Sequence, residues 1–161
     1  MRRIGWVSAT SCAVAVAVAM GGARIMGADG QGKDDRERGR GCSEATIRGD
    51  YGIQIQGTRP APGGLTESVI GVVLRNYDGH GNISQVDNVK GSITGIVPDR
   101  QGFGTYEVNP DCTGIARFQP GPGILLEERL VIVDGGREIR SMVLAPAGVM
   151  VTGVHQRIHA R

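Results

Sequence analysis

Two charged residues interrupt stretches that otherwise read as apolar strands. Arg75 falls within the Val-, Ile- and Leu-rich segment Ser68–Tyr77, and Glu128 falls within Leu125–Val133. A charge inside a protein is too costly to keep unless it is paired or hydrogen-bonded. We therefore expect Arg75 and Glu128, if both point inward, to pair with each other or to meet a polar group of a ligand.

A wider set of polar side chains could share that interior. The hypothesis is a ligand-binding site inside a barrel, formed by Tyr51, Arg75, Tyr106, Glu128 and Gln156. The alternative is that the charges lie at the barrel mouths or outside, and that the tyrosines only fill the core. The sequence leaves both interpretations open and identifies no catalytic residue.

Several familiar arrangements of reactive side chains are incomplete. His155 and His159 would lie about 13 Å apart in a strand, too far to share a metal, and the glutamate of a zinc-protease motif is absent. Asp78, Asn82 and Asp87 lack the spacing and the closing glutamate of a calcium loop. There is no nucleophile elbow and no nucleotide-binding glycine pattern ahead of a helix. We therefore expect neither a metal nor a cofactor.

The cysteines indicate a disulfide. The chain has three cysteines, and removal of an N-terminal signal would take Cys12 away. An even pair of thiols in an oxidising compartment is normally bridged, so we predict a disulfide between Cys42 and Cys112. It would close a loop of about 70 residues, which stabilises a fold by roughly 4 kcal/mol in the chain-entropy model. The alternative is two free thiols, although no histidine pattern is present to activate one.

The first residues have the layout of a secretory signal. A basic start, Arg2-Arg3, precedes an apolar run over residues 13–20, and small residues follow it. We expect residues 1–28 to be a signal peptide and the protein to be secreted or periplasmic. The predicted cleavage site is near Gly21, Ala23 or Ala28. The apolar run is shorter than the roughly 20 residues of a membrane span, so we expect no span after cleavage; an uncleaved anchor is the alternative.

A charged segment separates the predicted signal from the domain. Residues 29–41 carry charges of both signs, several glycines and no apolar side chain, which is typical of a disordered leader. Acidic residues alternate with the arginines, and the formal net charge of the chain is only +2. We therefore expect no nucleic-acid partner. The remaining residues, 42–161, have the size of a single domain.

The domain reads as a series of short strands joined by turn residues. Tyr51, Ile53 and Ile55 alternate with glycine and glutamine, the period of a half-buried strand. Gly, Asp, Asn and Pro separate this strand from those that follow, including the stretch PDRQG at residues 98–102. The expected strand segments are 51–56, 68–77, 83–90, 92–97, 105–108, 115–118, 125–133, 138–144 and 149–158.

These segments predict an all-β fold, because none of them has a helical stripe. Consecutive hairpins favour an antiparallel up-and-down barrel of about eight strands, since closure removes exposed sheet edges. A barrel of this size is either filled by side chains or holds one small ligand. Aromatic residues make up only 4% of the chain, which leaves room for a cavity.

Strand parity assigns the inward faces. In segment 68–77 Arg75 shares a face with Val69, Gly71, Val73 and Tyr77; if that face is interior, Arg75 is an inward cation. Glu128 is assigned inward because its face of segment 125–133 carries fewer charges than the other. In the last strand we assign the less charged face, which carries Gln156, to the interior. The face with His155 and Arg157 is then expected outside.

Three segments resemble parts of small exported bacterial proteins that are mostly uncharacterised. They are NYDGHGNIS (Asn76–Ser84), GTYEVNPDCTG (Gly104–Gly114) and LVIVDGGREIRSM (Leu130–Met142). Those proteins are thought to form a barrel similar to allene oxide cyclase, in the calycin-like group. The resemblance implies that fold over most of Cys42–Ile158. No catalytic residue of the allene oxide cyclases matches a position here, so the resemblance assigns no active site.

Three functions from different classes fit these observations. The first is a secreted barrel that binds a small apolar or amphipathic molecule. The second is a structural or surface-interaction protein with a filled barrel. The third is a cofactor-free cyclase or isomerase of the allene oxide cyclase type, which needs only a shaped cavity and one or two polar groups. The sequence leaves open whether the protein is an enzyme, and it does not give the oligomeric state.

Overall fold

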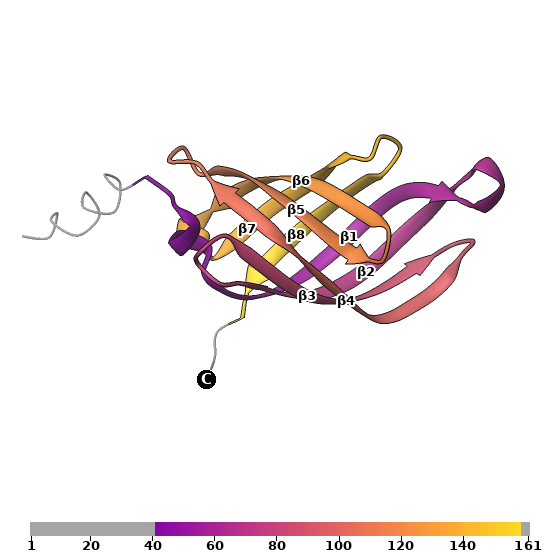
Figure 1. Ribbon diagram of the computed structural model, residues 1–161, viewed down its shortest axis with the longest axis horizontal. Helices are drawn as coiled ribbons and strands as arrows, with labels where there is room; N and C mark the ends of the chain where they lie inside the picture. Colours follow the sequence, from indigo (N-terminus) through magenta and orange to yellow (C-terminus); the bar gives the residue numbers. More distant parts are fainter. Residues whose placement is uncertain (1–40, 159–161) are drawn as a thin grey trace, which may run out of the picture.

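A computed structural model describes residues 41–158, which form one closed antiparallel barrel (Figure 1). The predicted signal peptide and nearly all of the predicted leader lie outside the described residues. Each strand pairs with the next along the chain, and the first strand also pairs with the last. The eight strands are β1 (Gly49–Ala61), β2 (Leu65–Tyr77), β3 (Asn82–Gly91), β4 (Gly95–Val108), β5 (Thr113–Gly121), β6 (Ile124–Val133), β7 (Glu138–Ala145) and β8 (Met150–Arg157). The predicted all-β, up-and-down barrel is confirmed.

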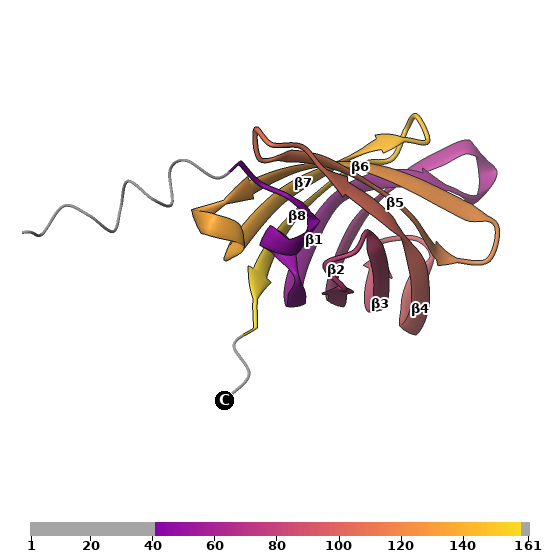
Figure 2. The ribbon, with the colours of Figure 1, turned by 60° about the vertical axis from the view of Figure 1, so that its left-hand side comes forward.

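Three short 3-10 turns complete the described chain. They are η1 (Glu44–Ile47), η2 (Pro62–Gly64) and η3 (Asp134–Gly136). None of the helical segments within residues 41–158 has the length and apolar character needed to cross a membrane. The turn η1 lies across one end of the barrel, beside η3 and the end of β8 (Figure 2). This end is the closed end of the barrel, and the opposite end is its mouth.

The predicted disulfide is present. Cys42 and Cys112 are bridged, with a Cα–Cα distance of 4.9 Å. Cys42 begins the domain just before η1, and Cys112 lies in the turn between β4 and β5, where its φ of 64° is left-handed. The Cys42 backbone N–H also donates to the Pro110 carbonyl at 3.1 Å. The bridge thus fastens the start of the domain to a hairpin tip at the closed end.

The strands alternate between interior and solvent as their sequence period requires. On β2 Glu67, Val69, Val73, Arg75 and Tyr77 are buried, while Ile70, Val72 and Leu74 are exposed. On β6 Glu128, Leu130 and Ile132 are buried. The inward face predicted for Glu128 is therefore confirmed, and the face that carries Arg75 is interior, so Arg75 is an inward cation.

The interior face predicted for the last strand is wrong. On β8 Gly153 and His155 are buried, Arg157 is half-buried, and Gln156 is exposed. The less charged face was the wrong choice because the polar groups on the inward face of β8 have partners inside the barrel. His155 contacts Tyr77 and Ser141, and Arg157 contacts the Tyr51 hydroxyl.

The stretch PDRQG does not break the sheet, contrary to the prediction of a turn. It lies within the single strand β4, which replaces two predicted strands and begins at Gly95 rather than Ser92. The pairing of β3 with β4 shifts register between Asp87 and Val89, and Asp99 has a φ of 48°. The proline and the aspartate therefore mark a bulge within a strand.

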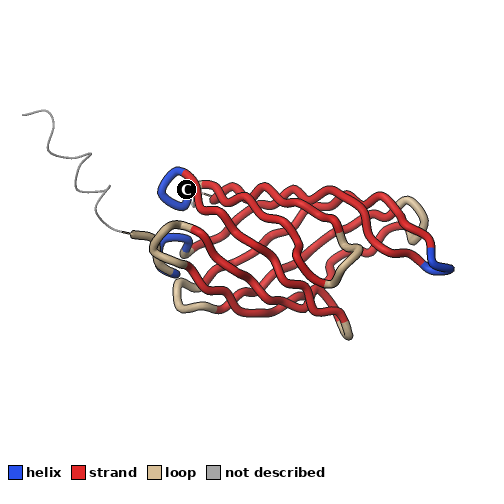
Figure 3. Tube along the Cα trace, turned by 90° about the horizontal axis from the view of Figure 1, so that it is seen from above, coloured by secondary structure: helices blue, strands red, loops and turns tan. Residues whose placement is uncertain are grey.

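The hairpins differ in length, and two of them project at the mouth (Figure 3). β1 pairs with β8 only as far as Thr58, and β4 pairs with β5 only from Phe103 onward. The ends of the β1–β2 and β3–β4 hairpins therefore extend beyond the rest of the barrel. They form one side of the entrance to its interior.

Candidate functional site

The barrel interior is filled at the closed end and hollow toward the mouth. A cavity of about 280 Å³ opens among the mouth-side halves of the strands. Most of its wall is apolar and comes from both sides of the barrel. The apolar lining residues are Ile55, Pro60, Val69, Val73, Phe118, Pro120, Ile124, Leu126, Val143, Val149 and Val151. The remaining lining residues are Arg59, Arg75, Gln85, Asp87, Arg100 and Glu128.

Arg75 forms the polar floor of this cavity. Its Nη1 donates to Glu128 Oε2 at 2.8 Å, and its Nε donates to Gln85 Oε1 at 2.8 Å. Nη1 also donates to the Tyr77 hydroxyl at 3.2 Å, and the guanidinium lies 4.3 Å from the centre of the Phe118 ring. Arg75 and Glu128 are both buried, so their pairing satisfies the first of the two outcomes expected from the sequence.

Two atoms of this ion pair still face open space. Among the described residues, Arg75 Nη2 and Glu128 Oε1 take part in none of the hydrogen bonds around the floor. Yet no buried side-chain nitrogen or oxygen in that part of the chain lacks a hydrogen-bond partner. Both atoms therefore keep some accessibility, and their residues line the cavity. The floor presents one donor and one acceptor to whatever occupies the space.

A second ion pair continues the polar lining toward the mouth. Arg100 donates to Asp87 through Nε at 2.9 Å and through Nη2 at 3.1 Å, a bidentate contact. Gln85 Nε2 reaches Asp87 Oδ2 at 3.3 Å, which links this pair to Arg75. Polar groups on β2, β3 and β4 thus form a continuous track from floor to mouth.

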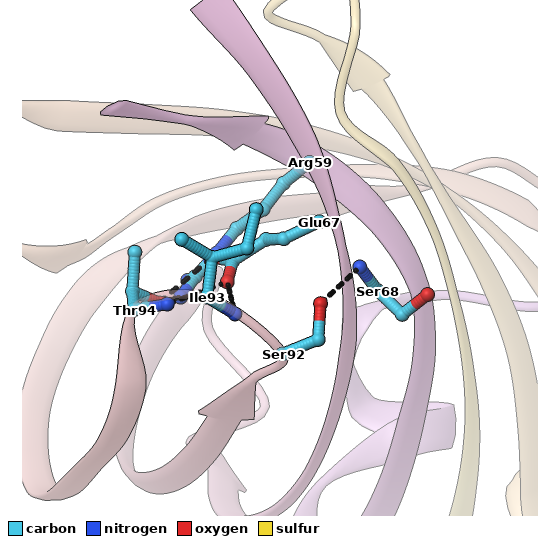
Figure 4. Close-up of polar contacts among 6 residues, drawn as sticks. All are labelled: Arg59, Glu67, Ser68, Ser92, Ile93 and Thr94. Atoms are coloured by element: carbon cyan, nitrogen blue, oxygen red, sulfur yellow. Dashed lines mark hydrogen bonds and ion pairs between the residues drawn. The ribbon is translucent and has the colours of Figure 1, made fainter. Parts of the chain in front are cut away.

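A third charged cluster holds the two projecting hairpins together (Figure 4). The buried carboxylate of Glu67 accepts hydrogen bonds from the backbone N–H groups of Ile93 and Thr94, each at 2.9 Å. It also accepts from the Thr94 hydroxyl at 2.7 Å and from Arg59 Nε at 2.8 Å. The Thr94 backbone N–H, with Arg59 and Ile93, lowers the pKa of Glu67 to about 2 against the opposing effect of burial. A side chain at Gly91 would overlap this carboxylate.

Behind the floor, a hydrogen-bonded relay runs toward the far wall. Tyr77 OH lies 3.2 Å from His155 Nδ1, and His155 Nε2 lies 2.9 Å from Ser141 Oγ. Because Arg75 already donates to the Tyr77 oxygen, the phenol proton is directed to His155 Nδ1. Burial, with the nearby Arg75 cation, holds the pKa of His155 well below its usual value. His155 is therefore neutral, with its proton on Nε2.

This proton arrangement argues against a serine nucleophile. With the proton on Nε2, as the Tyr77 contact favours, His155 donates to Ser141 Oγ and is not placed as a base for the serine hydroxyl. Neither Ser141 nor His155 lines the cavity. Burial also raises the pKa of Tyr77 to about 12 despite Arg75, which keeps the phenol protonated. The relay links Arg75 on β2 to Ser141 on β7 through Tyr77 and His155.

The closed end contains all three tyrosines of the chain. The Tyr77 ring meets those of Tyr51 and Tyr106 edge-on, at centroid distances of 5.4 and 4.9 Å. Tyr106 OH donates to the Glu44 carbonyl at 3.1 Å, and Arg157 Nη2 donates to Tyr51 OH at 2.8 Å. The fully buried Ile47 packs with this cluster from η1. These contacts seal the barrel.

The five predicted site residues separate into three groups. Arg75 and Glu128 line the cavity. Tyr51 and Tyr106 are buried inside the barrel as predicted, but they lie at the closed end and do not line the cavity. Gln156 lies on the outside of β8, so its predicted interior position is wrong.

Sequence reasoning missed the charged and polar residues that surround Arg75. Gln85 and Asp87 share parity with Ile83 and Val89 on β3, and that alternation could have placed them inside. Arg100 was not identified because it lies in the stretch PDRQG, which was interpreted as a turn. Asp87 entered only as part of an incomplete calcium motif. Within residues 41–158, no group of three or more His, Cys, Asp or Glu side chains is placed to hold a metal ion.

Comparisons with protein families, with curated proteins and with solved structures found no match to this chain. The similarity to the allene oxide cyclase barrels therefore stays a prediction from sequence segments. Functional inference depends on the geometry of the cavity itself.

Proposed function

We propose that this protein binds a small apolar or amphipathic molecule in the cavity of its barrel. The observation that carries the proposal is a cavity of about 280 Å³ with a mainly apolar wall and a polar floor. An apolar cavity of about 150 Å³ can hold benzene, so this one has space for about ten to twelve non-hydrogen atoms. Small-ligand sites typically combine such apolar walls with a few directed polar groups.

We further propose that the protein does this outside the cytoplasm. The signal-like first residues support export, and the Cys42–Cys112 disulfide is compatible with an oxidising compartment. We also propose that this barrel is related to the barrel of the allene oxide cyclase group. The mass of the protein recovered from its own source tests export, because it gives the cleavage position directly. An intact N-terminus would contradict a cleaved signal.

A cavity-filling variant provides the direct test of binding. Naphthalene is about the size of the cavity, and we expect it to bind the wild-type protein and raise its Tm. Val143 is buried and lines the cavity, so Val143→Phe should abolish that shift. Val131→Phe is the matched control, because Val131 lies exposed on β6, and its shift should match that of wild type.

Native mass spectrometry then looks for the natural ligand. A bound mass that is lost on denaturation would identify the molecule carried from the source. If naphthalene fails to bind the wild-type protein, or if Val143→Phe binds it equally well, the cavity is not a binding site. The alternative function, a structural or surface-interaction protein, would then be favoured.

A cyclase or isomerase is the second candidate, because the accessible atoms of Arg75 and Glu128 could polarise a confined substrate. Conversion of the molecule found by native mass spectrometry would support it. Recovery of that molecule unchanged after incubation with fresh protein would favour a carrier.

A further inference from the structure

We infer that the ligand carries a hydroxyl at its buried end, so that the preferred ligand is a small apolar alcohol. This inference rests on the proposed function and specifies the chemical class of the molecule bound. It follows from the two atoms of the floor ion pair that face the cavity, Arg75 Nη2 and Glu128 Oε1. One is a donor and the other is an acceptor.

The position of the two atoms restricts the size of the group that satisfies them. They belong to side chains that already touch, with Nη1 and Oε2 2.8 Å apart. The Arg75 guanidinium is also held by other contacts. Gln85 and Tyr77 hold the guanidinium, and the Phe118 ring lies against its face. A single small group at the floor can therefore accept from Arg75 and donate to Glu128.

Charge balance determines the class of that group. Arg75 and Glu128 neutralise each other, and so do Asp87 and Arg100 further up the wall. A carboxylate ligand would bring a second anion beside Glu128, and an ammonium ligand would bring a second cation beside Arg75. Either would enter a buried site without a compensating charge. A hydroxyl carries no charge and has both a donor and an acceptor.

The cavity wall above the floor offers an apolar surface to the rest of the ligand. Val73, Leu126 and Val143 are apolar residues of the cavity lining, and they come from three different strands. They leave few hydrogen-bonding groups for a second polar substituent on that side of the cavity. We therefore infer that the body of the ligand lies against this apolar side, with its hydroxyl at the floor.

A matched set of four eight-carbon probes tests this class. Calorimetric titration of the purified protein at pH 7 would use n-octanol, its isomer heptyl methyl ether, octanoate and octylammonium. We expect n-octanol to bind about tenfold more tightly than the ether, which accepts but cannot donate. It should also bind more tightly than either charged probe.

The outcomes separate this inference from the proposed function. If the ether binds as tightly as n-octanol, or if a charged probe binds most tightly, the hydroxyl assignment is overturned while cavity binding stands. If none of the four binds, the proposed function fails as well.

Two neighbouring glutamates supply the variant and its control. Glu128→Gln removes the negative charge and leaves Arg75 unbalanced, so octanoate should bind about tenfold more tightly than it binds wild type. Glu127→Gln changes the adjacent residue, which faces outward toward Arg117. Its probe preference should match wild type. Unchanged octanoate affinity in a folded Glu128→Gln variant would contradict the role of Glu128.

A double variant keeps the test open if Glu128→Gln fails to fold. Arg75→Met with Glu128→Leu replaces the whole ion pair by apolar side chains, which buried pairs often tolerate. This variant should bind n-octanol and heptyl methyl ether equally. A tenfold preference for n-octanol that persisted in the double variant would place the hydroxyl elsewhere and overturn the inference.

Discussion

The two halves of the barrel interior use polar groups in opposite ways. At the closed end, Tyr51 and Tyr106 direct their hydroxyls to backbone carbonyls, and Arg157 closes over Tyr51. Toward the mouth, Arg75 and Glu128 are equally buried, yet each retains an atom that faces open space. Polar groups that are fully satisfied seal a structure, whereas partly satisfied ones leave a site for a partner. This difference is why the proposed binding site lies in the mouth half.

Breaking the floor ion pair should have the largest effect on stability. Glu128→Leu leaves the buried Arg75 cation without its carboxylate, and we expect the free energy of unfolding to fall by about 3–5 kcal/mol. Urea denaturation would measure it. Glu127→Leu is the control, because it removes an exposed ion pair of the same length, 2.8 Å, between Glu127 and Arg117. Equal losses in the two variants would contradict the burial argument.

Opening the disulfide tests the closed end alone. Cys42→Ser with Cys112→Ser releases the start of the domain from the β4–β5 turn, and we expect a loss of about 2–4 kcal/mol. The octanol affinity should stay within about twofold of wild type, because the bridge lies at the end opposite the mouth. A large loss of affinity in the folded variant would show that the two halves are coupled.

Acid should weaken the layer between the two halves. His155 has a lowered pKa in the folded protein, so below pH 6.5 the unfolded chain takes up a proton that the folded chain does not. The contribution of the neutral His155 to the free energy of unfolding is therefore fully present above pH 6.5. It is lost as the pH falls, by up to about 1.4 kcal/mol per pH unit.

Denaturation at pH 6.5 and at pH 5.0 would measure the slope before most carboxylates titrate. His155→Gln should flatten the slope, whereas His80→Gln, at an exposed turn position, should not. A slope unchanged in His155→Gln would assign the acid sensitivity to other groups.

The smallest effect is expected at the exposed ion pair itself. Arg117→Gln removes contacts of a side chain that is 44% exposed, and we expect a change of at most about 0.5 kcal/mol. Salt should reduce even that difference. A change above about 1 kcal/mol would mean that the outer surface of β5 and β6 stabilises the barrel more than its exposure indicates.

Much of the architecture could be predicted because it follows from simple patterns along the chain. The alternation around Arg75 and Glu128 gave the correct inward faces, and the even pair of cysteines gave the disulfide. These inferences require only the alternation of residues along a strand, the composition of a turn or the number of cysteines. The closed barrel followed from hairpins that succeed one another along the chain.

The rest depended on partners that are distant in sequence. The face of β8 was assigned by its charge, but His155 is satisfied by Tyr77, 78 residues away. Asp99 and Arg100 were interpreted as a turn because a bulge uses the same residue types as a turn. Which end of the barrel is hollow depends on where the few aromatic side chains gather, and no single strand carries that information.

The even number of strands returns the chain to the end from which it started. The described chain begins at Gly41 and reaches Ile158 at the closed end, away from the mouth (Figure 1). A surface, a fusion partner or an affinity tag joined next to residue 41 or residue 158 would therefore be attached at the end opposite the entrance. Protein immobilised at that end should therefore bind the proposed ligand as readily as protein in solution.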